Sequence, residues 1–158
     1  MTKKETAIYI CSILKSINAY KIKTFDNRLR NQKLQYLLQT YNITPKLRYN
    51  LYIKGPYSPE LTELTYKVKN NYDNEVKSVS FVTNELKNNF KRFEYFIKYD
   101  NRKLELITTY LLFKEELNLS DTNAKKELIK LKSCTKKELN FAIKNYNKIK
   151  SDIYDKII

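Results

Sequence analysis

The chain contains a single glycine, Gly55, and the stretch around it constrains the fold more than any other. In residues 49–54, Tyr49, Leu51 and Ile53 alternate with Asn50, Tyr52 and Lys54, which is the period-2 pattern of a half-buried strand. Pro56 ends this strand together with the glycine, because glycine tolerates positive φ and proline has no N–H to donate. Ser58 and Pro59 follow as the N-cap and the first residue of a helix. Strand, sharp turn and helix are therefore predicted in direct succession.

The rest of the chain has the residue spacing of amphipathic helices. Seven helices are predicted, beginning near residues 2, 27, 59, 86, 100, 120 and 135, with capping boxes at residues 2–5 and 135–138. Residues 104–113 are apolar on nearly every side, as in a helix at the centre of a bundle. A second strand is predicted at residues 75–82, paired with residues 48–54. We therefore expect a single, mainly α domain spanning residues 1–158, with about seven helices and a small two-stranded antiparallel sheet.

Composition is typical of a soluble globular protein. The chain is 42% hydrophobic and 30% charged, and no stretch reaches the roughly 18 consecutive apolar residues of a membrane span. The first apolar run is interrupted by polar residues and lacks a small-residue cleavage pattern, so we interpret it as a helix of the fold and not as a signal peptide. Cys11 and Cys134 are too few for a disulfide framework and fall at expected core positions. A cytoplasmic protein without a membrane partner is predicted.

Composition also excludes several classes of catalytic site. The chain has no histidine, which removes Ser-His-Asp triads, Cys-His pairs and His-containing zinc sites. One glycine cannot form a P-loop or a dinucleotide-binding turn. Two cysteines 123 positions apart do not have zinc-finger spacing. The sequence therefore indicates no cofactor, no metal site and no catalytic residues, and a non-enzymatic protein is our leading interpretation.

Carboxylate-bound metal chemistry is the one enzymatic alternative. Asp73, Glu75 and Lys77 have the acid-x-Lys spacing that metal-dependent nucleases place on a strand, where alternate residues share a face. The motif is short and the chain is rich in Lys and Glu, so a solvated strand edge is the simpler interpretation.

The net charge of +14 is unevenly distributed along the chain. Residues 1–59 contain 11 Lys and Arg against two acidic residues, whereas residues 60–158 contain 20 against 15. Such asymmetry indicates an anionic partner, most often nucleic acid. AT-rich codon usage, which also raises the content of Lys, Asn, Ile and Tyr, is the alternative explanation.

The candidate contact residues lie in this first third of the chain. Two arginines and a lysine occupy the first turns of the second predicted helix, where the helix dipole disfavours cations. Either a binding surface or a carboxylate partner within the fold would keep them there. Tyr57 flanks the glycine on a turn expected to be exposed, and is either a contact residue or a lid on the core. The candidate set for nucleic acid or a protein partner is Lys15, Lys21, Lys23, Arg28, Arg30, Lys33, Arg48, Lys54 and Tyr57, beside a structural turn formed by Gly55, Pro56, Ser58 and Pro59.

Two stretches together resemble a known group of proteins. Residues 32–38, QKLQYLL, are similar to the QKLxYLL helix of the YwgA-like uncharacterised prokaryotic family, and residues 52–61, YIKGPYSPEL, resemble its YxYGPYSxEL turn. Residues 104–106, residues 126–133 and the helix of Glu138 follow in a similar order. More distantly, QKLxY followed by a GP turn is similar to the Panacea domain of SocA-like antitoxins. The resemblance implies a mostly helical domain that neutralises toxins or acts as an adaptor by direct protein contact, and it brings no catalytic residues.

Two functions are therefore expected to compete. The charge favours a non-enzymatic regulatory protein that contacts nucleic acid through its basic N-terminal third. The resemblance favours a Panacea-like antitoxin or adaptor, in a defence or toxin–antitoxin setting, whose protein partner is acidic.

Overall fold

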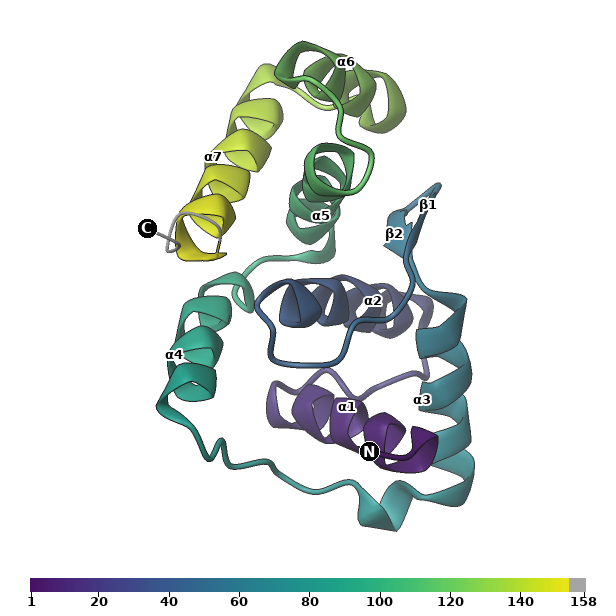
Figure 1. Ribbon diagram of the computed structural model, residues 1–158. Coiled ribbons are helices and arrows are strands. Elements are labelled where there is room, and N and C mark those ends of the chain that lie inside the picture. Colours follow the sequence, from purple (N-terminus) through teal and green to yellow (C-terminus); the bar gives the residue numbers. More distant parts are fainter. Residues whose placement is uncertain (154–158) are drawn as a thin grey trace.

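A computed structural model describes residues 1–153 (Figure 1). Its elements, in chain order, are α1 (Lys3–Ser16), α2 (Phe25–Thr40), β1 (Asn50–Tyr52), β2 (Gly55–Tyr57), α3 (Pro59–Asn71), the 3-10 turn η1 (Asp73–Glu75), α4 (Asn84–Phe93), the 3-10 turn η2 (Glu94–Phe96), α5 (Asn101–Glu115), α6 (Asp121–Lys132) and α7 (Lys136–Ile153). The predicted fold class, mainly α with a small two-stranded antiparallel sheet, is confirmed. No helix in residues 1–153 has the length and apolarity needed to cross a membrane.

Side-chain caps set the start of most helices. Six of them begin after a side-chain oxygen that accepts the backbone N–H three residues later, and these caps belong to Thr2, Thr24, Ser58, Thr83, Asp100 and Ser120. Both halves of the predicted capping box form at α7, where Glu138 N–H donates to Thr135 Oγ1 and the Glu138 carboxylate accepts from Thr135 N–H. Pro59 occupies the first position of α3, as predicted. Local sequence therefore determines these boundaries.

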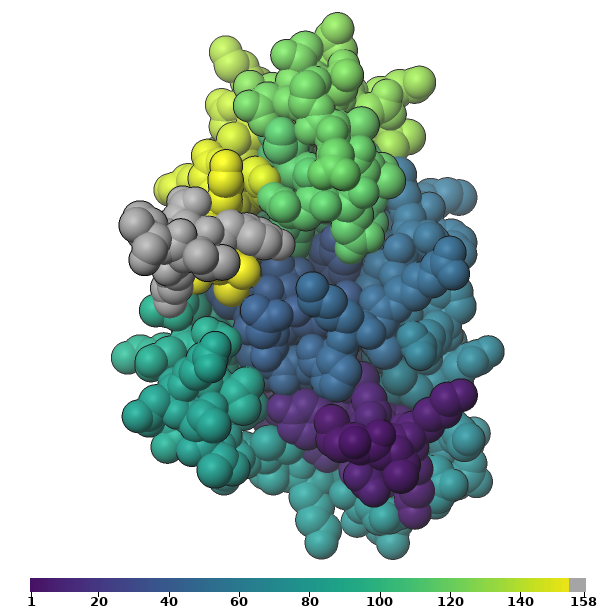
Figure 2. Space-filling view, viewed as in Figure 1, coloured from purple at the N-terminus to yellow at the C-terminus, as the bar shows by residue number. Residues whose placement is uncertain are grey.

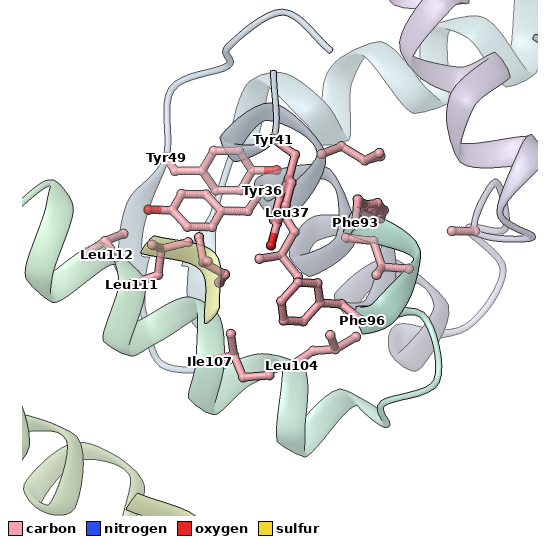
Figure 3. Close-up of a cluster of buried hydrophobic side chains, with 14 of the residues drawn as sticks. Tyr36, Leu37, Tyr41, Tyr49, Phe93, Phe96, Leu104, Ile107, Leu111 and Leu112 are labelled. Carbon is pink, nitrogen blue, oxygen red and sulfur yellow. The ribbon is translucent and has the colours of Figure 1, made fainter. Parts of the chain in front are cut away.

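Helix α5 lies at the centre of the fold and packs against α2, α6, α7 and the hairpin (Figure 1). Its residues 104–113 are all buried, as predicted for a central helix. Both cysteines lie in the core as free thiols, and burial raises the pKa of Cys11 to about 12. Figure 3 shows the core where α2, α5 and the end of α4 meet, formed by Tyr36, Leu37, Tyr41, Tyr49, Phe93, Phe96, Leu104, Ile107, Leu111 and Leu112.

The sheet is a local hairpin around the glycine. Strand β1 pairs antiparallel with β2, and Tyr52 lies opposite Gly55. Gly55, at φ +94°, does not end a strand but begins the second one, because its left-handed backbone lets the chain return after a two-residue turn. The predicted pairing of residues 48–54 with residues 75–82 is wrong, since the hairpin supplies a nearer partner strand.

The segment predicted as the second strand is an extended connection along α1. Residues 73–75 form η1, and residues 76–82 belong to no sheet. Serine side chains of α1 hold this backbone: the N–H of Lys77 donates to Ser12 Oγ at 3.3 Å, and the N–H of Val79 donates to Ser16 Oγ at 3.4 Å. In the space-filling view this part of the chain lies beneath α1 (Figure 2). Its apolar alternation therefore reflects packing against a helix.

Candidate functional site

The two stretches QKLQYLL and YIKGPYSPEL contact each other directly. Gln32 Nε2 donates to Ser58 O at 3.0 Å, and Gln32 Oε1 accepts from Ser58 N–H at 2.8 Å. The same Nε2 donates to Thr62 Oγ1 at 3.1 Å, and Tyr49 OH donates to Gln32 O at 3.0 Å. We call Gln32, Tyr49, Ser58 and Thr62 the clasp. It joins α2 to the start of α3, so these motif residues have a structural role.

A cluster of three buried charged side chains lies beneath the hairpin. Lys132 of α6 donates to Glu105 Oε1 of α5 and to Ile53 O in the turn, both at 2.6 Å. Lys33 of α2 donates to Pro56 O at 2.8 Å. The exposed fractions of the three residues are 2% for Lys33, 7% for Lys132 and 9% for Glu105. We call Lys33, Glu105 and Lys132 the buried charge cluster, and it anchors the hairpin to three helices.

The cluster carries more positive than negative charge. Burial lowers the pKa of Lys33 to about 8; the Glu105 carboxylate opposes this effect, and the Lys132 ammonium adds to it. Thr109 Oγ1 is also buried and has no hydrogen-bond partner among residues 1–153. Two ammonium groups and one carboxylate therefore leave one net positive charge inside the protein at neutral pH.

Gly55 is required at this place for two reasons. Its φ of +94° lies in the region that side chains disfavour. A Cβ at this position would lie 2.9 Å from Thr109 Oγ1, 3.3 Å from Glu105 Cγ and 3.4 Å from Lys33 Cε. Because Gly55 has no side chain, the hairpin can approach the buried charge cluster this closely.

Three of the predicted contact residues bind within the fold. Arg30 donates to the carbonyl oxygens of Tyr99 and Ile97, at 2.8 and 2.5 Å. Arg28 donates to two carbonyls of the preceding connection, and Lys33 lies in the buried charge cluster. Main-chain oxygens accept hydrogen bonds from the cations at the start of α2. The carboxylates of Asp100 and Glu105 also favour the charged forms of Arg30 and Lys33, so the carboxylate partner considered from sequence contributes as well. Lys33 is removed from the predicted contact surface, because its ammonium group is buried.

The other predicted contact residues lie at several places on the surface. Exposed side chains are Lys15, Lys21, Lys23, Arg48 and Lys54. Lys15 Nζ also donates to Val76 O at 3.4 Å. Tyr57 is half-buried: its hydroxyl shares a 2.6 Å hydrogen bond with Thr62 Oγ1, and its ring packs edge-on against Tyr52. Lys21 and Lys23, in the connection before α2, therefore remain as the exposed centre of the predicted basic surface.

The acid-x-Lys triplet does not lie on a strand. Asp73 and Glu75 belong to η1, and Lys77 follows in the extended connection. Asp73 accepts a hydrogen bond from Tyr20 OH at 2.9 Å, and Glu75 forms an ion pair with Lys4 at 3.4 Å. Within residues 1–153, no three His, Cys, Asp or Glu side chains gather in a way that could hold a metal ion. The strand face on which the nuclease hypothesis depended is therefore not formed.

A row of aromatic rings, which the sequence did not reveal, lies where η2 meets α5 and α7. Tyr95 and Tyr99 pack edge to face with ring centroids 5.8 Å apart, and Tyr99 packs in the same way against Phe141 at 5.1 Å. Tyr99 OH donates to Tyr95 OH at 3.2 Å. The row thus joins residues from η2, the following connection and α7.

Lysines surround this row. Lys98 Nζ lies 3.9 Å from the centroid of the Tyr95 ring, and Lys148 Nζ lies 4.7 Å from it. The Tyr99 hydroxyl, followed by the nearby lysine charges, lowers the pKa of Tyr95 despite some desolvation. We call this surface the basic aromatic face; it consists of Tyr95, Lys98, Tyr99, Lys103, Phe141, Lys144 and Lys148. Of its four lysines, Lys148 forms an ion pair with Asp152, whereas the other three form none within residues 1–153.

A hollow of about 360 Å³ opens at the Phe141 end of the face. Its lining residues are Asp100, Arg102, Lys103, Leu106, Lys137, Glu138 and Phe141. Arg102 and Glu138 neutralise each other in a 3.0 Å ion pair, whereas Lys103 and Lys137 form no ion pair with residues 1–153. With Asp100 included, three cations and two carboxylates line the hollow, so it combines an aromatic wall with a small excess of positive charge.

The basic aromatic face adjoins the basic connection before α2. Arg30 binds the carbonyls of Ile97 and Tyr99, and Asn101 Nδ2 donates to Asp26 O at 3.0 Å. The start of α2 therefore lies against the connection from η2 to α5. The spacing of residues 95, 98 and 99 could have indicated part of the face, because residues three and four apart share one side of a helix. Phe141 could not have been included, because it reaches the face only through the packing of α7.

No family model, no curated protein and no solved structure matches this chain.

Proposed function

We propose that this protein is a non-enzymatic, nucleic-acid-binding regulatory protein. The observation that carries the proposal is the excess of surface cations without acidic partners. Of 31 Lys and Arg residues in the sequence, six form ion pairs within residues 1–153. A polyanion would bind such a surface favourably, because each phosphate that is neutralised releases counterions.

The neighbours of these cations favour nucleic acid over an acidic protein. Phe25 is exposed in the first turn of α2, next to Arg28, and Tyr95 is exposed among the lysines of the basic aromatic face. Both basic segments thus present flat rings beside their charges. Nucleic acid offers phosphates for the cations and bases for the rings, whereas an acidic peptide uses only the cations.

The test is fluorescence anisotropy with labelled oligonucleotides of about 20 nucleotides over a salt series. We expect affinity to fall by about 0.7–0.9 log units per log unit of salt for each phosphate contacted, with weak sequence preference because phosphate contacts do not read bases. Lys21→Glu with Lys23→Glu should weaken binding to every oligonucleotide alike. Lys125→Glu with Lys130→Glu is the matched control, since it reverses the same charge on α6, away from α1 and α2 (Figure 1).

Two results would contradict the proposal. One is binding no tighter than that of an unrelated Lys-rich protein. The other is an equal loss in the two charge-reversal variants, because net charge and not a defined surface would then explain the binding.

A protein-binding function, as in Panacea-like antitoxins and adaptors, is the second candidate. It is favoured by the tip of the hairpin, where Ile53 is 90% exposed. A hollow of about 370 Å³ lined by Leu51, Phe113, Leu117 and Leu119, among others, lies beside β1. If a toxin-like gene lies next to this one, its product should co-purify with the wild type and be lost with Ile53→Asp. Co-purification unaffected by that substitution would exclude the hairpin tip as the contact.

The non-enzymatic part of the proposal has its own test. We expect labelled DNA and RNA to remain intact with Mg²⁺ or Mn²⁺, because Asp73 and Glu75 are engaged by Tyr20 and Lys4 and do not share a strand face. Metal-dependent cleavage that disappears with Glu75→Ala would make the protein a nuclease.

A further inference from the structure

Tyr95 is exposed, whereas the residue that follows it in the chain is buried. Phe96 is fully buried and packs against Tyr41 at 5.9 Å between ring centroids. Tyr95, the residue before it, is 36% exposed, and cations lie over its ring. The Tyr95 ring packs edge-on against the rings of Phe96 and Tyr99, and its hydroxyl accepts a hydrogen bond from Tyr99 OH, so the ring is supported at the surface. A large ring that is supported at the surface and does not fill the core is suited to contact a flat partner.

The lysines beside the ring do not compete strongly with such a partner. A cation over an exposed ring is held more weakly than a base stacked on an aromatic side chain. Lys98 has an exposed, flexible side chain, so its ammonium group can move from the Tyr95 ring to a neighbouring phosphate. A base would thus stack on the Tyr95 ring while its phosphate binds the Lys98 ammonium group.

The row of rings ends at a place where a second base can be held. Tyr99 connects Tyr95 to Phe141, and Phe141 forms a wall of the 360 Å³ hollow. Lys103 and Lys137 line the same hollow. Rings and cations are therefore interleaved from Tyr95 to the hollow, as bases and phosphates are along a single strand.

We propose that the basic aromatic face binds single-stranded nucleic acid, with one base stacked on Tyr95 and a nearby base in the hollow beside Phe141. This inference rests on the proposed function, and it specifies that the nucleic acid is single-stranded and that it binds at the basic aromatic face. A duplex presents its phosphates but keeps the faces of its bases stacked inside, so it would use the lysines and leave the rings without a partner.

The experiment compares tyrosine variants by fluorescence anisotropy with labelled oligothymidine and with a labelled duplex of equal length. Tyr95→Ala should weaken binding to the single strand by between about 5-fold and 150-fold, the range measured for loss of a stacked base, and should leave duplex binding unchanged. Tyr95→Phe should bind as the wild type does, because it keeps the ring. Tyr66→Ala is the matched control, since Tyr66 is 40% exposed on α3, outside the face.

Charge variants report on the phosphate contacts. Lys98→Gln and Lys144→Gln should each reduce the dependence of log affinity on log salt by about one phosphate, whereas Tyr95→Ala should leave that slope unchanged. Circular dichroism melts verify that each variant is folded, and Tyr95→Leu replaces the alanine variant if the latter melts early.

The outcomes separate this inference from the proposed function. Salt-dependent binding that is equal for the wild type and Tyr95→Ala, or equal losses with Tyr95→Ala and Tyr66→Ala, would overturn the stacking site and leave nucleic-acid binding in place. Absence of salt-dependent binding to either oligonucleotide would overturn both.

Discussion

Replacing Lys33 by methionine should change how the stability of the protein depends on pH. Methionine keeps a long flexible side chain in the core and removes the charge. Burial lowers the pKa of Lys33 in the folded protein to about 8, from an ordinary value of 10.5. Between these two values the unfolded chain binds more protons than the folded one, so the Lys33 contribution to stability becomes more favourable as pH rises. The variant lacks this contribution.

The magnitude follows from the same two pKa values. Each pKa unit corresponds to about 1.4 kcal/mol, so the buried charge lowers the free energy of unfolding by roughly 3 kcal/mol at pH 7. Most of this penalty is removed by pH 10. The variant also leaves Pro56 O without the Lys33 hydrogen bond, which costs about 1–3 kcal/mol at every pH. Lys33→Met should therefore be at least as stable as the wild type at pH 7, and lose about 2–3 kcal/mol relative to it by pH 10.

The assay is urea unfolding followed by far-UV circular dichroism at intervals from about pH 7 to pH 10. Only the difference between the two proteins is interpreted, because Cys11 and the buried tyrosines titrate in both and cancel. Lys46→Met, at an exposed lysine in the connection before β1, controls for the loss of one charge. Parallel stability curves for Lys33→Met and the wild type would refute the reasoning, because they would show that the Lys33 ammonium is not desolvated by folding.

Three further predictions concern the hairpin and its supports. Gly55→Ala should lower the free energy of unfolding by about 2–5 kcal/mol, the sum of left-handed strain and overpacking; a thermal melt equal to that of the wild type would contradict the need for glycine. Lys132→Met should lower it by about 3–5 kcal/mol, because Glu105 would remain buried without its partner. Urea unfolding measures this loss, and adding Glu105→Gln should recover part of it; no loss in the single variant would exclude a buried ion pair. Gln32→Leu removes both hydrogen bonds to Ser58, so the Ser58 amide should exchange with solvent faster; unchanged exchange would show that the clasp does not hold α3.

The sequence by itself determined the features that depend on residues close together in the chain. A cap and the amide it accepts are three residues apart, so Thr2, Ser58, Asp100 and Ser120 could be recognised without knowledge of the fold. The apolar run of α5 predicted a central helix, because apolar side chains on every side of a helix must be buried, whichever elements pack against them. The short spacing around Gly55 likewise predicted a sharp turn followed by a helix.

Only the tertiary structure decided which of the charged and aromatic residues are available to a partner. A lysine has the same identity whether it is exposed, as Lys21 is, or buried under a hairpin, as Lys33 is. What distinguishes them is a carbonyl oxygen and a carboxylate from other elements, and local periodicity carries no information about such groups. For the same reason the sequence did not predict the basic aromatic face: Tyr95 and Phe141 come together only after α7 packs beside η2. Local patterns determine where elements begin, whereas the chemistry of a surface depends on which elements pack side by side.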